Sequence, residues 1–158
     1  MLIGSYTQMI IISPYAKTYV NGQTNPKNYP YWQELIPLIN EPIVQVGVKD
    51  EKPLVNDFRP NLTLAQLEKL VKECRTWISC DSFLQHFCWD LGKPGIVLWG
   101  QSDPLIYGHP ENINLLKDRT YLYHNQFLSW DLIPMRSDCF VQPATVVDAL
   151  SQFSQCQK

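Results

Sequence analysis

Apolar residues along this chain gather in two alternating patterns. Short, largely apolar runs typical of buried strands occur at Met9–Ile12, Ile43–Val46, Trp77–Cys80 and Gly95–Trp99. Longer segments with apolar positions three or four residues apart, typical of amphipathic helices, occur at Tyr31–Asn40, Thr63–Cys74, Asp81–Leu91 and Pro143–Phe153. Further short strands are predicted at Leu54–Phe58 and Tyr121–Tyr123. This alternation predicts an α/β domain with a mostly parallel sheet and helices on both faces.

Several residues refine these boundaries. Thr63 is a suitable N-cap, and Pro143 suits the first turn of the last helix. Pro37 predicts a kink or an early end for the helix that contains it. Tyr15–Pro30 is rich in Asn, Gly, Pro and Tyr and lacks apolar periodicity, so it predicts a long loop, which in a compact domain is usually functional or disordered.

Composition narrows the class of protein. The 158 residues, 45% of them hydrophobic, suit a single domain over 1–158. A net charge of −2 provides no general attraction to nucleic acid, and no apolar run is long enough to span a membrane. The first twelve residues lack a basic region and a cleavage site, and the five cysteines form no CxxC pair, so we expect a cytoplasmic protein with reduced thiols.

The chemistry is expected where strands end, because parallel sheets bind ligands beyond the carboxyl ends of their strands. Asp81-Ser82 follows one strand and opens a helix, whose free first amides suit a phosphate or diphosphate. The alternative is that Asp81 or Ser82 caps the helix with its side chain, and the residues alone favour this cap. His86 alone is more typical of packing than of catalysis, and no zinc or other metal site is expected.

Two other strand ends carry polar residues. The loop after the first strand brings Lys17 and Lys27, which suit a diphosphate unless they are ordinary solvated lysines. Gly47 is followed by Asp50-Glu51, whose carboxylates suit ribose hydroxyls unless they form an ordinary charged turn. Asp103-Pro104 predicts a turn that bounds the pocket. No GxGxxG motif or P-loop occurs, which disfavours a classical dinucleotide or NTPase site.

Together these segments resemble glycosyltransferase family 9, the heptosyltransferase family, specifically the carboxyl-terminal, donor-binding half of its two-domain GT-B fold. The resemblance covers nearly the whole chain, in the segments Ile12–Pro14, Lys27–Trp32, Val46–Glu51, Asp81–His86, Lys93–Pro104 and Cys139–Ala149. It implies a single Rossmann-like domain that binds a nucleoside diphosphate sugar, with no other cofactor. The expected donor-binding residues are Ser13, Tyr15, Lys17, Lys27, Gly47, Glu51, Asp81, Ser82, Phe83, Gln85 and His86.

Two departures from the family pattern shape the functional hypotheses. Phe83 stands where the family usually has glycine, and Met1 immediately precedes the first strand, so the acceptor-binding amino-terminal half is expected to be absent. One hypothesis is an enzyme for hexosyl or heptosyl transfer that works with a separate acceptor-domain chain or as a homo-oligomer. The other is a free-standing protein that binds or sequesters a nucleotide without catalysis. The isolated chain is expected to be inactive in transfer, and no catalytic residue is assigned.

Overall fold

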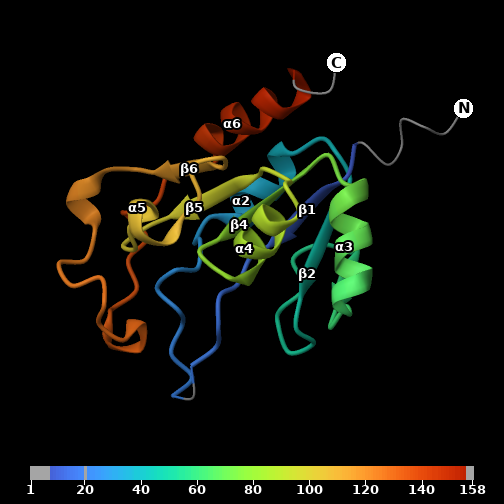
Figure 1. Cartoon of the computed structure of the whole chain (residues 1–158). Coiled ribbons are helices and arrows are strands. Elements are labelled where there is room, and N and C mark those ends of the chain that lie inside the picture. The colour runs from blue at the N-terminus through green and yellow to red at the C-terminus, as the bar shows by residue number, and fades with distance from the viewer. Residues whose placement is uncertain (1–7, 20, 156–158) are drawn as a thin grey trace, which may run out of the picture.

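A computed structural model describes residues 8–19 and 21–155 (Figure 1). In this part of the chain one sheet contains six strands, all parallel, in the order β3-β2-β1-β4-β5-β6. The strands are β1 (Ile10–Ser13), β2 (Ile43–Gly47), β3 (Phe58–Pro60), β4 (Thr76–Cys80), β5 (Ile96–Trp99) and β6 (Ile113–Leu116). The predicted α/β class with a parallel sheet is confirmed.

Helices cover both faces of this sheet. They are α2 (Trp32–Leu35), which continues as the 3-10 turn η1 (Ile36–Leu38), α3 (Leu64–Glu73), α4 (Phe83–Asp90), α5 (Pro104–Tyr107) and α6 (Pro143–Gln155). Side chains alternate along a strand, so Ile10 and Ile12 of β1 pack with α2 and α6, whereas Ile11 packs with α3 and α4. All three isoleucines are fully buried, which makes β1 the centre of two separate cores.

The differences from the predicted elements have local causes. The helix predicted over Tyr31–Asn40 narrows to a 3-10 turn at Pro37, as the proline indicated. The edge strand expected at Leu54–Phe58 begins only at Phe58. The strand predicted at Tyr121–Tyr123 is wrong, because Arg119–Tyr121 form the 3-10 turn η2. The last strand is instead β6, a short, half-buried edge strand that its sequence does not distinguish from a loop.

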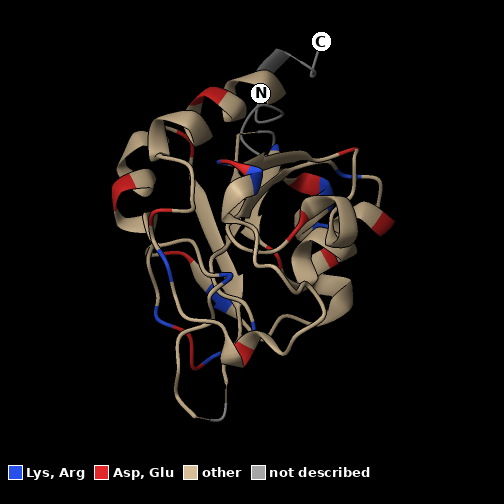
Figure 2. Ribbon diagram, turned by 90° about the vertical axis from the view of Figure 1, so that its left-hand side faces the viewer, with Lys and Arg blue, Asp and Glu red and all other residues tan. Residues whose placement is uncertain are grey.

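Residues of both charges alternate along the described part of the chain. Figure 2 shows Lys and Arg interspersed with Asp and Glu over helices and loops. Within residues 8–19 and 21–155, none of the helices combines the length and the apolar character that crossing a membrane requires.

The cysteine side chains lie inside the domain. Cys74, Cys80, Cys88 and Cys139 are buried and free, and the fifth, Cys156, falls outside the described residues. Burial raises the pKa of Cys74 to about 11 and that of Cys80 to about 12, so both are protonated at neutral pH. These thiols therefore act as small core residues and not as nucleophiles.

Helix α3 begins with a capping box at Thr63. The Thr63 hydroxyl accepts a hydrogen bond from the Gln66 amide at 3.1 Å, and the Gln66 side chain accepts one from the Thr63 amide at 2.9 Å. This confirms Thr63 as the N-cap. The box fixes the helix start whose residues Leu64 and Leu67 face the main cavity.

We predict that Thr63→Ala lowers the free energy of unfolding by about 1 kcal/mol, because the Gln66 amide loses its acceptor. The expected fall in melting temperature is about 2–4 °C, measured by thermal unfolding. Thr63→Ser keeps the hydroxyl and should stay close to the wild type. Equal melting temperatures for the alanine and serine variants would contradict the capping role.

Candidate functional site

The main cavity of the domain lies at the carboxyl ends of β1, β2 and β4 and has a volume of about 1090 Å³. These three strands are neighbours in the sheet and run parallel, so the segments that follow them meet at one edge. In Figure 1 the long loop after β1 lies at the lower edge together with the β2–β3 loop. The cavity is therefore built from loops and helix starts that are far apart in the sequence.

Most of the residues singled out from the sequence meet in this cavity. Its lining includes Ser13, Tyr15, Lys17, Lys27, Gly47, Glu51, Asp81, Ser82 and Phe83. Gln85 and His86 are not part of the lining. Gln85 is fully buried behind it and donates a hydrogen bond to Asp81. Asp103, expected to bound the pocket, also lies outside the lining and instead caps α5 and pairs with Arg119.

His86 belongs to an aromatic cluster outside the lining. Its Nδ1 lies 2.8 Å from Nε2 of His109, whose ring stacks on Trp89 with centroids 4.5 Å apart. Partial burial and the neighbouring His109 lower the pKa of His86, which favours the neutral imidazole. Within the described part of the chain, no group of three or more His, Cys, Asp or Glu residues is arranged to hold a metal ion.

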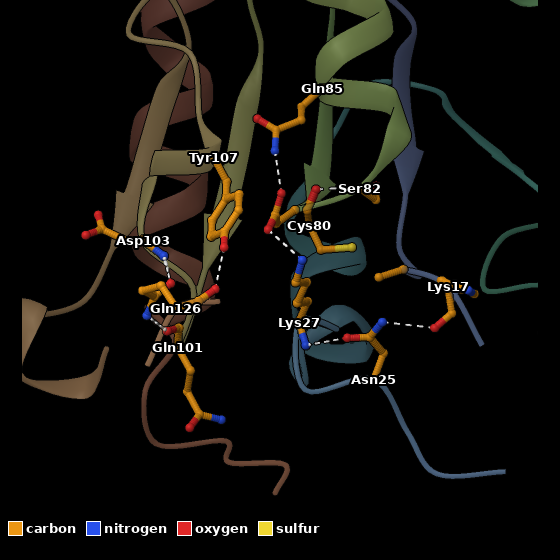
Figure 3. A network of polar contacts seen from close by, with 12 residues as sticks. Lys17, Asn25, Lys27, Cys80, Ser82, Gln85, Gln101, Asp103, Tyr107 and Gln126 are labelled. Carbon is orange, nitrogen blue, oxygen red and sulfur yellow. Dashed lines mark hydrogen bonds and ion pairs between the residues drawn. The ribbon is translucent and has the colours of Figure 1, made fainter. Parts of the chain in front are cut away.

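Lys27 and Asp81 form an ion pair on the wall of the cavity. The ammonium lies 3.0 Å from the Asp81 carboxylate, and the two side chains are only 18% and 6% exposed. The ammonium also lies over the rings of Trp130 and Tyr107, 5.0 and 5.6 Å from their centroids. Figure 3 shows Lys27 reaching toward the start of α4. Lys27 is thus no solvated loop lysine, whereas Lys17 is exposed.

The loop that carries Lys27 is held by its own side chains. The Asn25 carboxamide accepts a hydrogen bond from the Lys27 amide at 3.0 Å and donates one to the Lys17 carbonyl at 2.9 Å (Figure 3). The Asn28 side chain accepts a further bond from the Ala16 amide at 2.7 Å. These bonds shape the turn before any ligand arrives, so Lys27 is positioned at little further entropic cost.

The start of α4 has no side-chain cap. Ser82 occupies the N-cap position, but its hydroxyl donates toward the Cys80 carbonyl at 3.4 Å, and Asp81 is engaged by Lys27 and Gln85. The cap favoured from the sequence is therefore wrong, because the Lys27 ammonium competes for the buried carboxylate of Asp81. The first amides of α4, beside cavity-lining Ser82, Phe83 and Leu84, are left available to an anion.

Glu51 brings an unpaired carboxylate to the opposite side of the cavity. Its Oε2 is buried and has no hydrogen-bond partner in the described residues, and burial raises the pKa of Glu51. Gly47 makes this position possible, because a Cβ there would overlap the Glu51 carboxylate. A ligand hydroxyl that donates to Oε2 would satisfy this oxygen.

The cavity also contains residues that sequence reasoning missed. Arg59 belongs to β3 and Asn61 follows that strand, and Leu62, Leu64 and Leu67 form an apolar wall. Arg59 was missed because β3 was predicted too early in the chain. Leu64 and Phe83 are 64% and 59% exposed, which is unusual for large apolar side chains and fits the rim of a binding site. Ser129 and Trp130 arrive from a distant segment with no local signal.

Comparison with known proteins points to one family. The profile of glycosyltransferase family 9 (heptosyltransferase) matches residues 9–121, more than half of the chain. No curated protein matches the sequence significantly.

Three solved structures share the fold. E. coli ADP-heptose LPS heptosyltransferase II has a TM-score of 0.65 and 19% identity over 95% of this chain and 47% of its own. E. coli heptosyltransferase WaaC with ADP has a TM-score of 0.56 and 18% identity over 70% and 38%. The dodecameric iron-containing heptosyltransferase TibC in complex with ADP-D-β-D-heptose has a TM-score of 0.59 and 11% identity over 96% and 46%. The chain spans about half the length of these structures or less.

The unpaired Glu51 leads to a prediction about stability and pH. A raised pKa means that the folded protein prefers the protonated acid, so this preference stabilises the fold at low pH and is lost as pH rises through the raised pKa. Glu51→Gln is neutral at every pH. It should therefore unfold at a higher temperature than wild type at pH 7, with a gain of up to about 1 kcal/mol for this partly exposed group.

The gain should vanish near pH 4, where wild-type Glu51 is itself neutral. Thermal unfolding at both pH values provides the measurement, and Asp50→Asn, at an exposed neighbouring carboxylate, serves as the control. A Glu51→Gln variant less stable than wild type at pH 7 would show that Glu51 already has a compensating partner.

Proposed function

This chain belongs to glycosyltransferase family 9, the heptosyltransferase family, and on that premise we propose that its cavity binds a nucleoside diphosphate sugar. The observation that carries the proposal is the uncapped start of α4 beside the partly buried cation of Lys27. Free helix amides and a fixed ammonium are what a diphosphate needs. An anion there would share Lys27 with Asp81, whose second oxygen stays bound to Gln85.

The rest of the cavity fits the other parts of such a ligand. Glu51 supplies a carboxylate for ribose hydroxyls, and it would repel the phosphates, which orients the nucleotide. Leu62, Leu64 and Leu67 provide an apolar wall suited to a base. In group transfer, Lys27 and the start of α4 would stabilise the charge that develops on the departing nucleoside diphosphate.

ADP-heptose is the first ligand to test. One structural relative was solved with ADP and another with ADP-D-β-D-heptose. At identities of 18% and 11%, these relatives support the fold and suggest the ligand class by analogy. A cytoplasmic location is part of the proposal, because the free thiols of the described cysteines suit a reducing compartment.

We predict that Lys27→Ala weakens the binding of ADP and ADP-heptose tenfold or more, as expected for about 1.5–3 kcal/mol lost with a charged hydrogen bond. Isothermal titration calorimetry provides the measurement, with pairs of other nucleoside diphosphates and their sugars tested alongside. Lys117→Ala is the matched control, because Lys117 donates to the Asp138 carbonyl at 2.7 Å and is not among the cavity-lining residues.

Removing Lys27 also leaves Asp81 without its buried partner, which can disturb the fold. The double variant Lys27→Met/Asp81→Asn removes both charges and keeps the aliphatic stem. If the ammonium itself contacts phosphate, this double variant should fold but bind ADP and ADP-heptose more weakly than wild type does. Wild-type affinity in the double variant would remove Lys27 from the binding site.

Transfer is the second part of the proposal. The domain alone is proposed to bind without transferring sugar, and a partner chain or a second copy would supply the acceptor site and a general base. A base typically contributes ~10²–10⁴-fold to the rate. We predict no release of ADP from ADP-heptose above the uncatalysed rate when the purified chain, kept monomeric by dilution, is incubated with an acceptor. Turnover by the monomer would contradict the proposal that a second polypeptide is needed.

A further inference from the structure

Residues 122–134 form one wall of the cavity although they lie beyond the family match, which ends at residue 121. The segment contains the 3-10 turn η3 (Trp130–Leu132). Ser129 and Trp130 line the cavity, and the Lys27 ammonium lies over the ring of Trp130. This part of the cavity wall therefore lies outside the residues that the family profile matches.

Hydrogen bonds of two glutamine side chains hold this segment, residues 122–134, in place. The Gln126 side chain donates to the Gln101 carbonyl at 2.9 Å and to the Tyr123 carbonyl at 2.8 Å, and it accepts from the Asp103 amide at 2.9 Å. The Tyr107 hydroxyl donates to the Gln126 carbonyl. Figure 3 shows Gln126 between Gln101, Asp103 and Tyr107.

The far end of the segment is held as well. The Gln101 side chain donates to the Pro134 carbonyl at 3.0 Å, and Ile133 is fully buried. The turn that presents Trp130 is thus fixed on both sides by contacts with the loop after β5 or with the core. A ring held in this way loses little conformational entropy when a ligand stacks on it.

The order of the strands in the sheet indicates which part of a bound nucleotide would lie next to Trp130. Glu51 and the apolar wall belong to the β2–β3 side, and the uncapped α4 start and Lys27 follow β4 and β1 in the middle. Residues 122–134 are hydrogen-bonded to the loop after β5, on the other side of β4. A nucleotide with its ribose at Glu51 and its phosphates at α4 therefore directs whatever follows the diphosphate toward Trp130.

We infer that Trp130 is a stacking platform for the sugar of a bound nucleoside diphosphate sugar. This inference rests on the proposed function of the cavity. Sugar rings present C–H groups on their faces, and these are attracted to the electron-rich face of an indole. Trp130 is only partly buried and lines the cavity, so part of its side chain is accessible to a ligand.

Polar groups flank the ring where sugar hydroxyls would lie. Ser129 is exposed in the cavity wall and donates a hydrogen bond to the Asp131 carboxylate. Tyr19, from the loop after β1, also lines the cavity, and its pKa is raised by burial and by the charge of Asp131. An aromatic face bordered by a carboxylate and hydroxyls is a common arrangement for carbohydrate recognition.

The test compares each nucleotide with its sugar conjugate. Affinities of wild type, Trp130→Ala and Trp130→Phe are measured by calorimetry for ADP and ADP-heptose, and for UDP and UDP-glucose. In the wild type the sugar conjugate of the preferred nucleotide should bind more tightly than the nucleotide alone. Trp130→Ala should weaken the conjugate roughly three- to tenfold, the size of an aromatic contact, and leave the nucleoside diphosphate nearly unchanged.

Trp130→Phe should recover part of the loss, because it retains an aromatic face. Trp89→Ala removes an exposed tryptophan of α4 that is not among the cavity-lining residues and should behave as wild type. An equal loss for nucleotide and conjugate in Trp130→Ala would show that the ring acts only through Lys27, and no loss for either would show that it has no role. Both outcomes overturn the platform but leave nucleotide binding intact. A wild type that binds none of the four ligands overturns the proposed function together with this inference.

Discussion

The parallel pairing of β1 with both β2 and β4 is the constraint on which the rest of this domain depends. The three central isoleucines of β1 are fully buried, and their side chains alternate between the two cores. Because the three strands run in the same direction, their last residues, Ser13, Gly47 and Cys80, lie at one edge of the sheet. The long loop, the Glu51 turn and the start of α4 are consequently gathered around a single cavity.

Charge placement in this cavity has a cost in stability. The buried Asp81 and the partly buried Lys27 lose contact with water, a cost that their attraction and the Gln85 hydrogen bond offset in part. The unpaired Glu51 oxygen adds a further cost. Such an arrangement is typical of a site whose polar groups are completed by a ligand, since hydrogen bonds withheld within the protein remain available for binding.

The fold and the family place this domain among heptosyltransferases, yet the chain corresponds to about half of the solved relatives. A donor-binding domain and a sequestering protein would use the same cavity, and they differ in whether a second body supplies an acceptor. Residues 122–134 lie outside the family match, and they contribute Ser129 and Trp130 to the cavity wall.

The sequence by itself determined the alternation of strands and helices, the capping role of Thr63 and the strand ends that carry Lys27, Glu51 and Asp81. These features depend on local periodicity and on parallel connectivity, which short windows of sequence record. Only the tertiary structure decided that Asp81 pairs with Lys27 and leaves α4 uncapped, and that Trp130 joins the site. The physical reason is that both outcomes depend on contacts across more than fifty residues of chain, where competition between partners is settled by packing and not by local preference.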